Sequence, residues 1–359
     1  MRLHRFPCSA AFAIILPAFM AAPVGAAEPE SVDLRYFREL VETRNYSLGQ
    51  PVSPQLTPDG KAVIFLRGGA RDPVLRLYEF TIADAKLREI LTPEKLLQGA
   101  EEKLTSEERS RRERERQSLR GFTNFQLSKD GGKLLVTLSS KLYVITRADS
   151  QITELPGRSW IDPHFSPDGR AVAAESGGDL HVIDLETQAD VALTSGANET
   201  LQHGVAEFVA QEEMDRHEGF WWAPDSQTIV YQESDNSGVE SRFIADPLHP
   251  ETAPVKNFYP RAGTNNAKVR LGLVARGGGA TRCIEWDRER FPYLARVVWA
   301  EAAAPLCVLV QNRAQQEEIL VAVDPATGTT RELLREKDAA WLNLPHKPIP
   351  VWQKDGRGF

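Results

Sequence analysis

Residues that build metal centres and disulfide frameworks are scarce in this sequence. Its 359 residues include 3 Cys and 7 His, and no cluster of them has the spacing of zinc ligands. Only Cys283 and Cys307 follow the N-terminal segment described below, so the sequence permits one disulfide and permits two free buried thiols equally well. We therefore predict no metal and no cofactor.

The sequence also lacks an excess of positive charge. The 43 Lys and Arg residues are outnumbered by 50 Asp and Glu residues, which gives a formal net charge of -7 at pH 7. Proteins that hold nucleic acid through its phosphates need a pooled basic surface, and none is visible in the sequence. We predict no nucleic-acid partner, and a hydrophobic fraction of 42% with mixed charge indicates a globular protein.

Long apolar runs are limited to one segment, Ala10–Ala22. It is shorter than the roughly 20 residues of a membrane span, it follows two arginines, and it leads to small residues at 24–27. This order is typical of a secretory signal. We expect residues 1–26 to be a signal peptide cleaved near Ala26, and the mature chain, 27–359, to be periplasmic or secreted with no stable membrane span.

The sequence does contain a repeated hairpin pattern. In each copy a short apolar strand leads into a turn built on Asp-Gly or a variant of it, and a second apolar strand follows. Proline fixes φ at the first central turn position and glycine accepts positive φ, so each copy closes a hairpin. The copies are Gln55–Leu66, Phe125–Leu138 and Phe165–Ala174, with looser ones at Trp221–Tyr231 and from Val351 onward around Lys354, Asp355 and Gly356.

Third strands follow most copies and give the pattern a period. Asp130 and Asp168, in the turns of the two closest copies, lie 38 residues apart. This is near the roughly 40-residue period of a four-stranded propeller blade, so the pattern predicts an all-β fold, a β-propeller. The third strands are Leu77–Phe80, Leu142–Ile145, Leu180–Ile183 and Ile319–Val323.

The first of two insertions in the repeat, Thr105–Arg116, is rich in charged residues and has no helix breaker. It predicts a short charged helix with Ser106 as its N-cap. Arg112 and Arg116 are four residues apart and share a face of this helix. One guanidinium can reach into a cavity, where its fork suits a peptide carbonyl or carboxylate. The alternative interpretation is a solvated surface helix.

The second insertion lies between Asp168 and Asp225 and contains the adjacent residues Glu212 and Glu213. On a helical turn, adjacent side chains point about 100° apart, so two carboxylates can hold a small cation between them. A peptide α-ammonium supplies the positive charge and three donors. The alternative is an ordinary exposed turn with acidic residues.

Segments in and after this insertion resemble a known family. Glu207–Met214, followed by Gly219–Asp225, resembles the glutamate motif and next blade of the dipeptidyl peptidase IV branch of the prolyl oligopeptidase superfamily. Phe258–Val269 is similar to that family's tyrosine, proline, basic, alanine, glycine signature, and Tyr293–Trp299 to the blade strand after it. The resemblance implies the recognition propeller of a serine exopeptidase that releases N-terminal X-Pro or X-Ala dipeptides.

The resemblance also implies roles for single residues. The paired glutamates of the family bind the free amino terminus of the peptide substrate, which carries over to Glu212 and Glu213, while Gln211 replaces the first acid of the family's triple. An arginine of the charged helix contacts the substrate backbone in relatives, and Arg112 is the best match, with Arg116 next. The resemblance further allows a homodimer of the full-length form.

The family's catalytic serine lies on the nucleophile elbow of a C-terminal α/β-hydrolase domain, followed by Asp and His. No Gly-x-Ser-x-Gly occurs in the 359 residues, so we predict no catalytic residue here and no turnover by this chain alone. The family propeller has eight blades, whereas this chain ends at Phe359 just after a predicted hairpin turn. We expect an incomplete propeller from a truncated or frameshifted coding sequence that lacks the hydrolase domain. The alternative, a non-catalytic periplasmic propeller binding peptides or a partner protein, predicts a stop after a completed blade.

Overall fold

The computed structural model describes residues 33–157, 159–299, 301–344, 349–353 and 355–359. The predicted signal peptide, residues 1–26, lies outside the described residues. No helix within the described ranges is long and apolar enough to cross a membrane.

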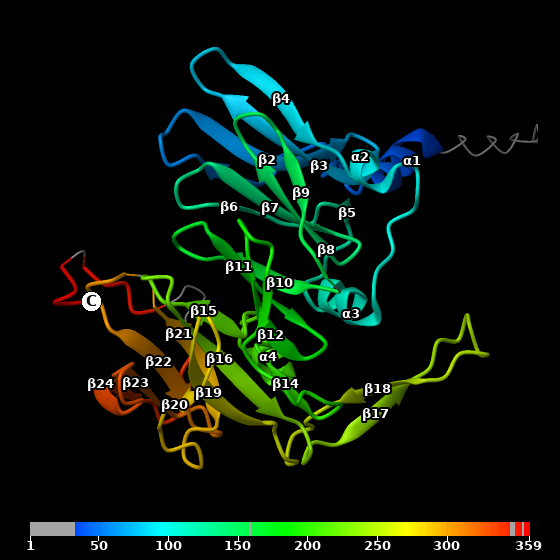
Figure 1. Ribbon diagram of the computed structural model, residues 1–359. Coiled ribbons are helices and arrows are strands. Elements are labelled where there is room, and N and C mark those ends of the chain that lie inside the picture. The colour runs from blue at the N-terminus through cyan, green and yellow to red at the C-terminus, as the bar shows by residue number, and fades with distance from the viewer. Residues whose placement is uncertain (1–32, 158, 300, 345–348, 354) are drawn as a thin grey trace, which may run out of the picture.

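The described residues form five antiparallel sheets, each with a path of four strands (Figure 1). The sheets follow one another in chain order, as the blades of a β-propeller do, so the predicted all-β propeller architecture is confirmed. Their strands are β1 Val52–Leu56, β2 Ala62–Gly69, β3 Asp72–Thr81 and β4 Lys86–Leu91; β6 Phe125–Leu127, β7 Lys133–Leu138, β8 Lys141–Thr146 and β9 Ile152–Glu154; β10 Ile161–Phe165, β11 Ala171–Ser176, β12 Asp179–Asp184 and β13 Asp190–Ala192; β14 Leu201–His203, β16 Thr228–Asp235, β19 Lys268–Ala275 and β20 Arg282–Cys283; and β21 Tyr293–Val298, β22 Leu306–Gln311, β23 Glu317–Val323 and β24 Thr330–Lys337.

Four of the five predicted hairpins are present, at β1–β2, β6–β7, β10–β11 and β15–β16, where β15 is Phe220–Trp222. The first three turns share one chemistry, a threonyl or seryl hydroxyl that donates to the aspartate of the turn. In the second, buried Ser128 donates its hydroxyl to Asp130 (2.6 Å), and Gly131 turns with φ +74°. In the fourth turn Ser226 takes the glycine position at φ +64° and accepts from the Asp168 amide of the preceding blade (2.9 Å). Ser226 therefore adopts a backbone conformation that favours glycine, and its hydroxyl forms a hydrogen bond between the two blades.

The fifth predicted hairpin, around Lys354, Asp355 and Gly356, does not form among the described residues, and Lys354 lies outside them. The Gly356 amide does close a turn onto the Gln353 carbonyl (2.9 Å), but no strand occurs among the described residues after Lys337. The fifth sheet, β21–β24, instead comes from the segment before it. Its first two strands, β21 and β22, are apolar and pair with each other, but the turn between them lacks the Asp-Gly pattern on which the hairpin prediction is based.

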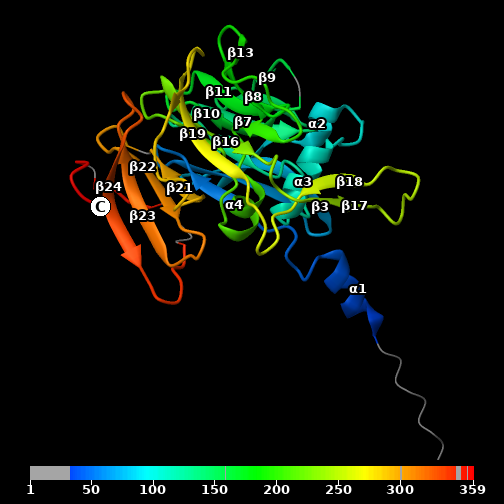
Figure 2. The ribbon, with the colours of Figure 1, turned by 90° about the horizontal axis from the view of Figure 1, so that it is seen from below.

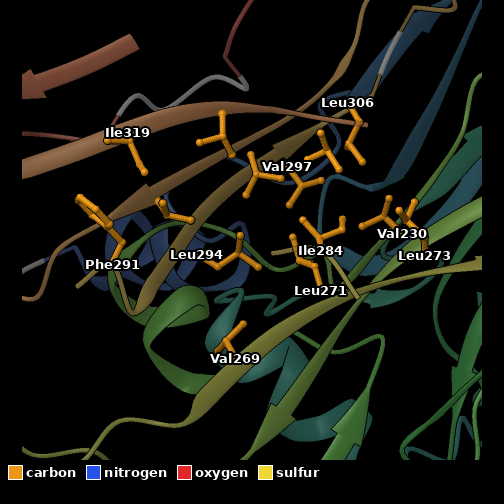
Figure 3. Packing of buried hydrophobic residues seen from close by; sticks show 14 residues of the cluster. Val230, Val269, Leu271, Leu273, Ile284, Phe291, Leu294, Val297, Leu306 and Ile319 are labelled. Carbon is orange, nitrogen blue, oxygen red and sulfur yellow. The ribbon is translucent and has the colours of Figure 1, made fainter. Parts of the chain in front are cut away.

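Packing between neighbouring sheets builds the core, because each strand sends alternate side chains to each face. Figure 3 shows this between the fourth and fifth sheets, where side chains of both interdigitate. The fourth contributes Val230, Val269, Leu271 and Leu273, with Ile284 just after its last strand, and the fifth contributes Leu294, Val297, Leu306 and Ile319, with Phe291 just before its first strand. This packing fixes the fifth sheet against the fourth.

The described part of the chain also contains four helices and a projecting arm, a two-stranded ribbon. The helices are α1 Leu34–Glu42, α2 Pro93–Leu97, α3 Ser106–Arg114 and α4 Phe208–Glu213. The arm consists of β17 Ser241–Ile244 and β18 Val255–Phe258 and extends away from the sheets (Figures 1 and 2). The short strand β5, Arg120–Gly121, runs parallel to β3.

The charged insertion forms α3, with two differences from its prediction. Thr105, not Ser106, is the N-cap, and its hydroxyl accepts from the Glu108 amide (3.1 Å). The helix ends at Arg114, and Arg116 lies beyond it with a left-handed φ of +53°, so Arg112 and Arg116 do not share a helical face.

Candidate functional site

A closed loop carries the paired glutamates. Val205 and Glu218 form an antiparallel bridge at its base, and behind them the backbones of Gly204 and Gly219 touch. A Cβ on Gly219 would lie 2.3 Å from the Gly204 carbonyl carbon, so only glycine allows this approach. The base of the loop therefore joins the inner strands of the fourth sheet, and α4 lies within the loop.

Glu212 and Glu213 lie at the C-terminal end of α4, and both are exposed. Their positions on one helical turn separate the side chains by about 100°. A carboxylate oxygen of Glu212 lies 3.8 Å from Nε of Arg114, whereas Glu213 has no ion-pair partner within the described ranges. The pair can thus offer one free and one lightly engaged carboxylate to a cation.

Arg114 brings the charged helix to this loop. Its Nη1 donates to Oε1 of Gln211 (3.2 Å), and the Gln211 amide in turn donates to the Ala206 carbonyl (2.5 Å). An acid at position 211 would neutralise Arg114, while the amide only accepts from it. The departure at Gln211 therefore leaves positive charge beside Glu212.

Arg112, the predicted substrate-contacting arginine, occupies a different environment. It is buried, and it pairs with Glu108 and Glu102 at 2.7 Å each. Burial raises the pKa of Glu108, but hydrogen bonds from Arg111 and Arg112 outweigh burial and hold that pKa below its usual value. Arg112 joins α3 to the segment before it.

The sequence contained a signal for Arg114 that our reasoning missed. Arg111 and Arg112 have Glu108 three and four residues before them, and both bind it. Arg114 has no acidic residue at either spacing, in either direction. Arg114 therefore has no acidic partner within the helix.

The two segments that carried the family resemblance meet in the structure. The Phe208 ring at the start of α4 packs edge-on against Tyr259, with ring centroids 4.9 Å apart. Tyr259 is half-exposed and follows directly after β18, so the arm and the glutamate loop share a contact. This aromatic pair links the start of α4 to the arm.

Comparison with known proteins identifies the family of this chain. Residues 125–359 match the family described as the dipeptidyl peptidase IV (DPP IV) N-terminal region. The chain belongs to this family. The DPP IV N-terminal region matched here includes α4 and Tyr259 and begins after α3.

Relatives of this DPP IV N-terminal region are longer proteins. Dipeptidyl peptidase 8 of Homo sapiens is 27% identical over 260 residues, which are 61% of this chain and 29% of the relative. Probable dipeptidyl-aminopeptidase B of Phaeosphaeria nodorum is 26% identical over 217 residues, 54% of this chain and 24% of the relative. The chain thus spans less than a third of the length of these relatives.

A solved structure shares the fold. The crystal structure of Porphyromonas gingivalis dipeptidyl peptidase 4 superposes with a TM-score of 0.65 at 18% identity, over 88% of this chain and 43% of that one. At this identity the likeness concerns the fold.

Proposed function

We propose that the chain is the substrate-recognition propeller of a dipeptidyl peptidase IV-like serine exopeptidase, and that Glu212 and Glu213 bind the α-ammonium of the peptide. The observation that carries the proposal is the pairing of two exposed adjacent carboxylates on a loop held at its base, next to a guanidinium. An ammonium placed between them can donate its three N–H groups to carboxylate oxygens, and its charge together with that of Arg114 balances the two carboxylates. A blocked amino terminus leaves the carboxylates uncompensated, which selects against it.

Arg114 complements this site. A peptide whose ammonium lies at Glu212 extends its first carbonyls within reach of a neighbouring guanidinium, for which carbonyl oxygens are suitable acceptors. The role predicted for Arg112 remains a proposal, and its ion pairs with Glu102 and Glu108 favour an indirect one: it holds α3 so that Arg114 faces the loop. The substrates released would be X-Pro or X-Ala dipeptides.

We further propose that hydrolysis needs a serine elbow from outside these 359 residues, since no Gly-x-Ser-x-Gly occurs in them. The domain division, a signal peptide at 1–26 and a propeller at 27–359, and an exported location belong to the same proposal. Homodimerisation of the full-length form is supported by the projecting β17–β18 arm, where Phe243, Ile244 and Leu248 are exposed.

Two measurements test the proposal. Titration calorimetry of the chain with Gly-Pro amide and with its N-acetyl form is expected to show binding of the free amine only. Equal binding of both would remove the ammonium site. Hydrolysis of a Gly-Pro chromogenic amide is expected to be absent with this chain and present with a chain extended through any downstream reading frame; turnover by the 359 residues alone would contradict the missing elbow.

A non-catalytic propeller that binds peptides or a partner protein is the second candidate. It is favoured by the same exposed carboxylates, which need no hydrolase domain to bind an ammonium. Selective binding of Gly-Pro amide without hydrolysis by any extended form would support it.

A further inference from the structure

Two buried arginines bind the backbone of the glutamate loop, residues 205–218, which carries Glu212 and Glu213. Arg216, within the loop, donates Nη1 to the Glu218 carbonyl (2.7 Å), and its Nε and Nη2 both reach the Leu294 carbonyl (3.2 and 3.1 Å). Arg296 donates to the Met214 carbonyl (2.6 Å). Leu294 and Arg296 belong to β21, so these bonds tie the loop to the neighbouring blade and not to the one from which it emerges.

This arrangement is costly. Burial lowers the pKa of Arg216, and the nearby charge of Arg296 acts in the same direction. One carboxylate oxygen of Glu207 lies 3.3 Å from Arg216 and also accepts from Gln232 (2.5 Å). Apolar side chains of similar volume often replace buried ion pairs without loss of stability. Donors that are kept buried and aimed at main-chain carbonyls fix the backbone of a segment.

The backbone they fix is the end of α4. Asp215 follows the helix with a left-handed φ of +51°, between Met214, whose carbonyl Arg296 binds, and Arg216 itself. The Arg216 amide closes back onto the Ala210 carbonyl (3.0 Å). A helix of six residues is too short to be stable by its own hydrogen bonds, so these contacts decide its orientation.

We propose that Arg216 is a positioning residue for the paired carboxylates: its buried guanidinium sets the orientation in which α4 presents Glu212 and Glu213, without contacting the ligand. The inference rests on the proposed ammonium site, of which it names the support. It follows that replacing Arg216 weakens binding of a peptide amino terminus although both carboxylates remain.

The test uses a charge-balanced variant, because Arg216→Met alone would leave Glu207 buried and unpaired. Arg216→Met with Glu207→Gln removes both charges and keeps the volume of the site. The double variant is expected to fold, and to bind Gly-Pro amide about tenfold more weakly, a loss of the size of one charge-assisted hydrogen bond. Arg216→Lys keeps the charge but not the planar guanidinium. Its affinity for Gly-Pro amide is expected to lie between those of the unaltered chain and the double variant. The control is Arg270→Met, which removes an exposed ion pair with Glu233 on the same sheet and is expected to bind as the unaltered chain does.

Hydrogen exchange of residues 205–218 gives a readout that does not depend on the ligand. Exchange there is expected to rise about tenfold in the double variant, and to stay unchanged in β10–β13. Unchanged affinity together with unchanged loop exchange would overturn the positioning role. If the unaltered chain fails to prefer Gly-Pro amide over its acetylated form, the ammonium site falls. The positioning of α4 then stands if loop exchange rises and falls if it does not.

Discussion

Glu318 faces Glu336 directly across the β23–β24 pair. Glu318 is buried, and it borders a cavity of about 260 Å³ lined mainly by apolar side chains, among them Leu309, Leu320 and Ile349. Burial, followed by the hydrogen bond with Glu336, raises the pKa of Glu318 to about 7. Glu318 is therefore protonated at mildly acidic pH and can donate a hydrogen bond to Glu336.

This pair predicts a stability that falls with rising pH. Since the folded-state pKa of Glu318 lies above its ordinary 4.5, the contribution is fully present below 4.5 and is lost as the pH rises through about 7. The melting temperature, followed by circular dichroism, is expected to fall between these pH values. Glu318→Gln should flatten that part of the profile, and an unchanged slope would contradict the assignment. Below pH 4.5, loss of the Glu317 ion pairs with Arg290 and Arg335 acts in the opposite direction, because these arginines lower the pKa of Glu317 to about 2.

Gly131 is expected to be more sensitive to substitution than Gly60. Both have left-handed φ, +74° and +69°, so alanine costs about 1 kcal/mol at either position. A Cβ on Gly131 would also lie 2.8 Å from Cδ of Pro58 in the preceding blade, whereas Gly60 faces open space. Gly131→Ala should therefore lower the urea midpoint of unfolding more than Gly60→Ala. Equal midpoints would contradict this prediction, because they would mean that the two blades can move apart to accommodate the Cβ with no loss of stability.

Two arginines of α3 are expected to separate stability from binding. Arg112→Ala breaks a buried ion pair with Glu102 and Glu108, which typically costs about 3 kcal/mol, and should lower the melting temperature. Arg114→Ala removes a partly exposed side chain and should leave the melting temperature nearly unchanged while weakening binding of Gly-Pro amide. Thermal melts and calorimetry on both variants check this. The reverse pattern would restore Arg112 as the ligand-contacting residue.

Charge removal at the paired glutamates tests the proposed site directly. Glu212→Gln and Glu213→Gln each replace a charge-assisted hydrogen bond by a neutral one, and each is expected to weaken binding of Gly-Pro amide about tenfold or more. Glu240→Gln, on an exposed ion pair with Arg261, is the matched control. Variants of 212 and 213 that bind as tightly as the control would remove these carboxylates from the site.

Much of the fold could be predicted from the sequence because its signals are local. A Ser-x-Asp-Gly turn closes a hairpin through contacts that span five residues, as at Ser128 and Asp130, and it needs no information from elsewhere in the chain. The prediction of the fifth hairpin was not met because it, too, used only a local signal. Lys354, Asp355 and Gly356 offer a turn, but strands form only where a neighbouring strand pairs with them, and no local pattern specifies that.

The sequence by itself determined the repeated blades, the acidic pair at Glu212 and Glu213, and a charged helix, since each depends on residue spacing along the chain. The spacing of charges along α3 marks Arg114 as lacking an acidic partner within the helix, but only the tertiary structure decided that it reaches the pair and what holds the pair in place. Arg114 meets Gln211 across 97 positions, and Arg216 meets Leu294 across 78. Contacts at such separation depend on how blades pack against one another, and the spacing of charges along one segment carries no record of that packing.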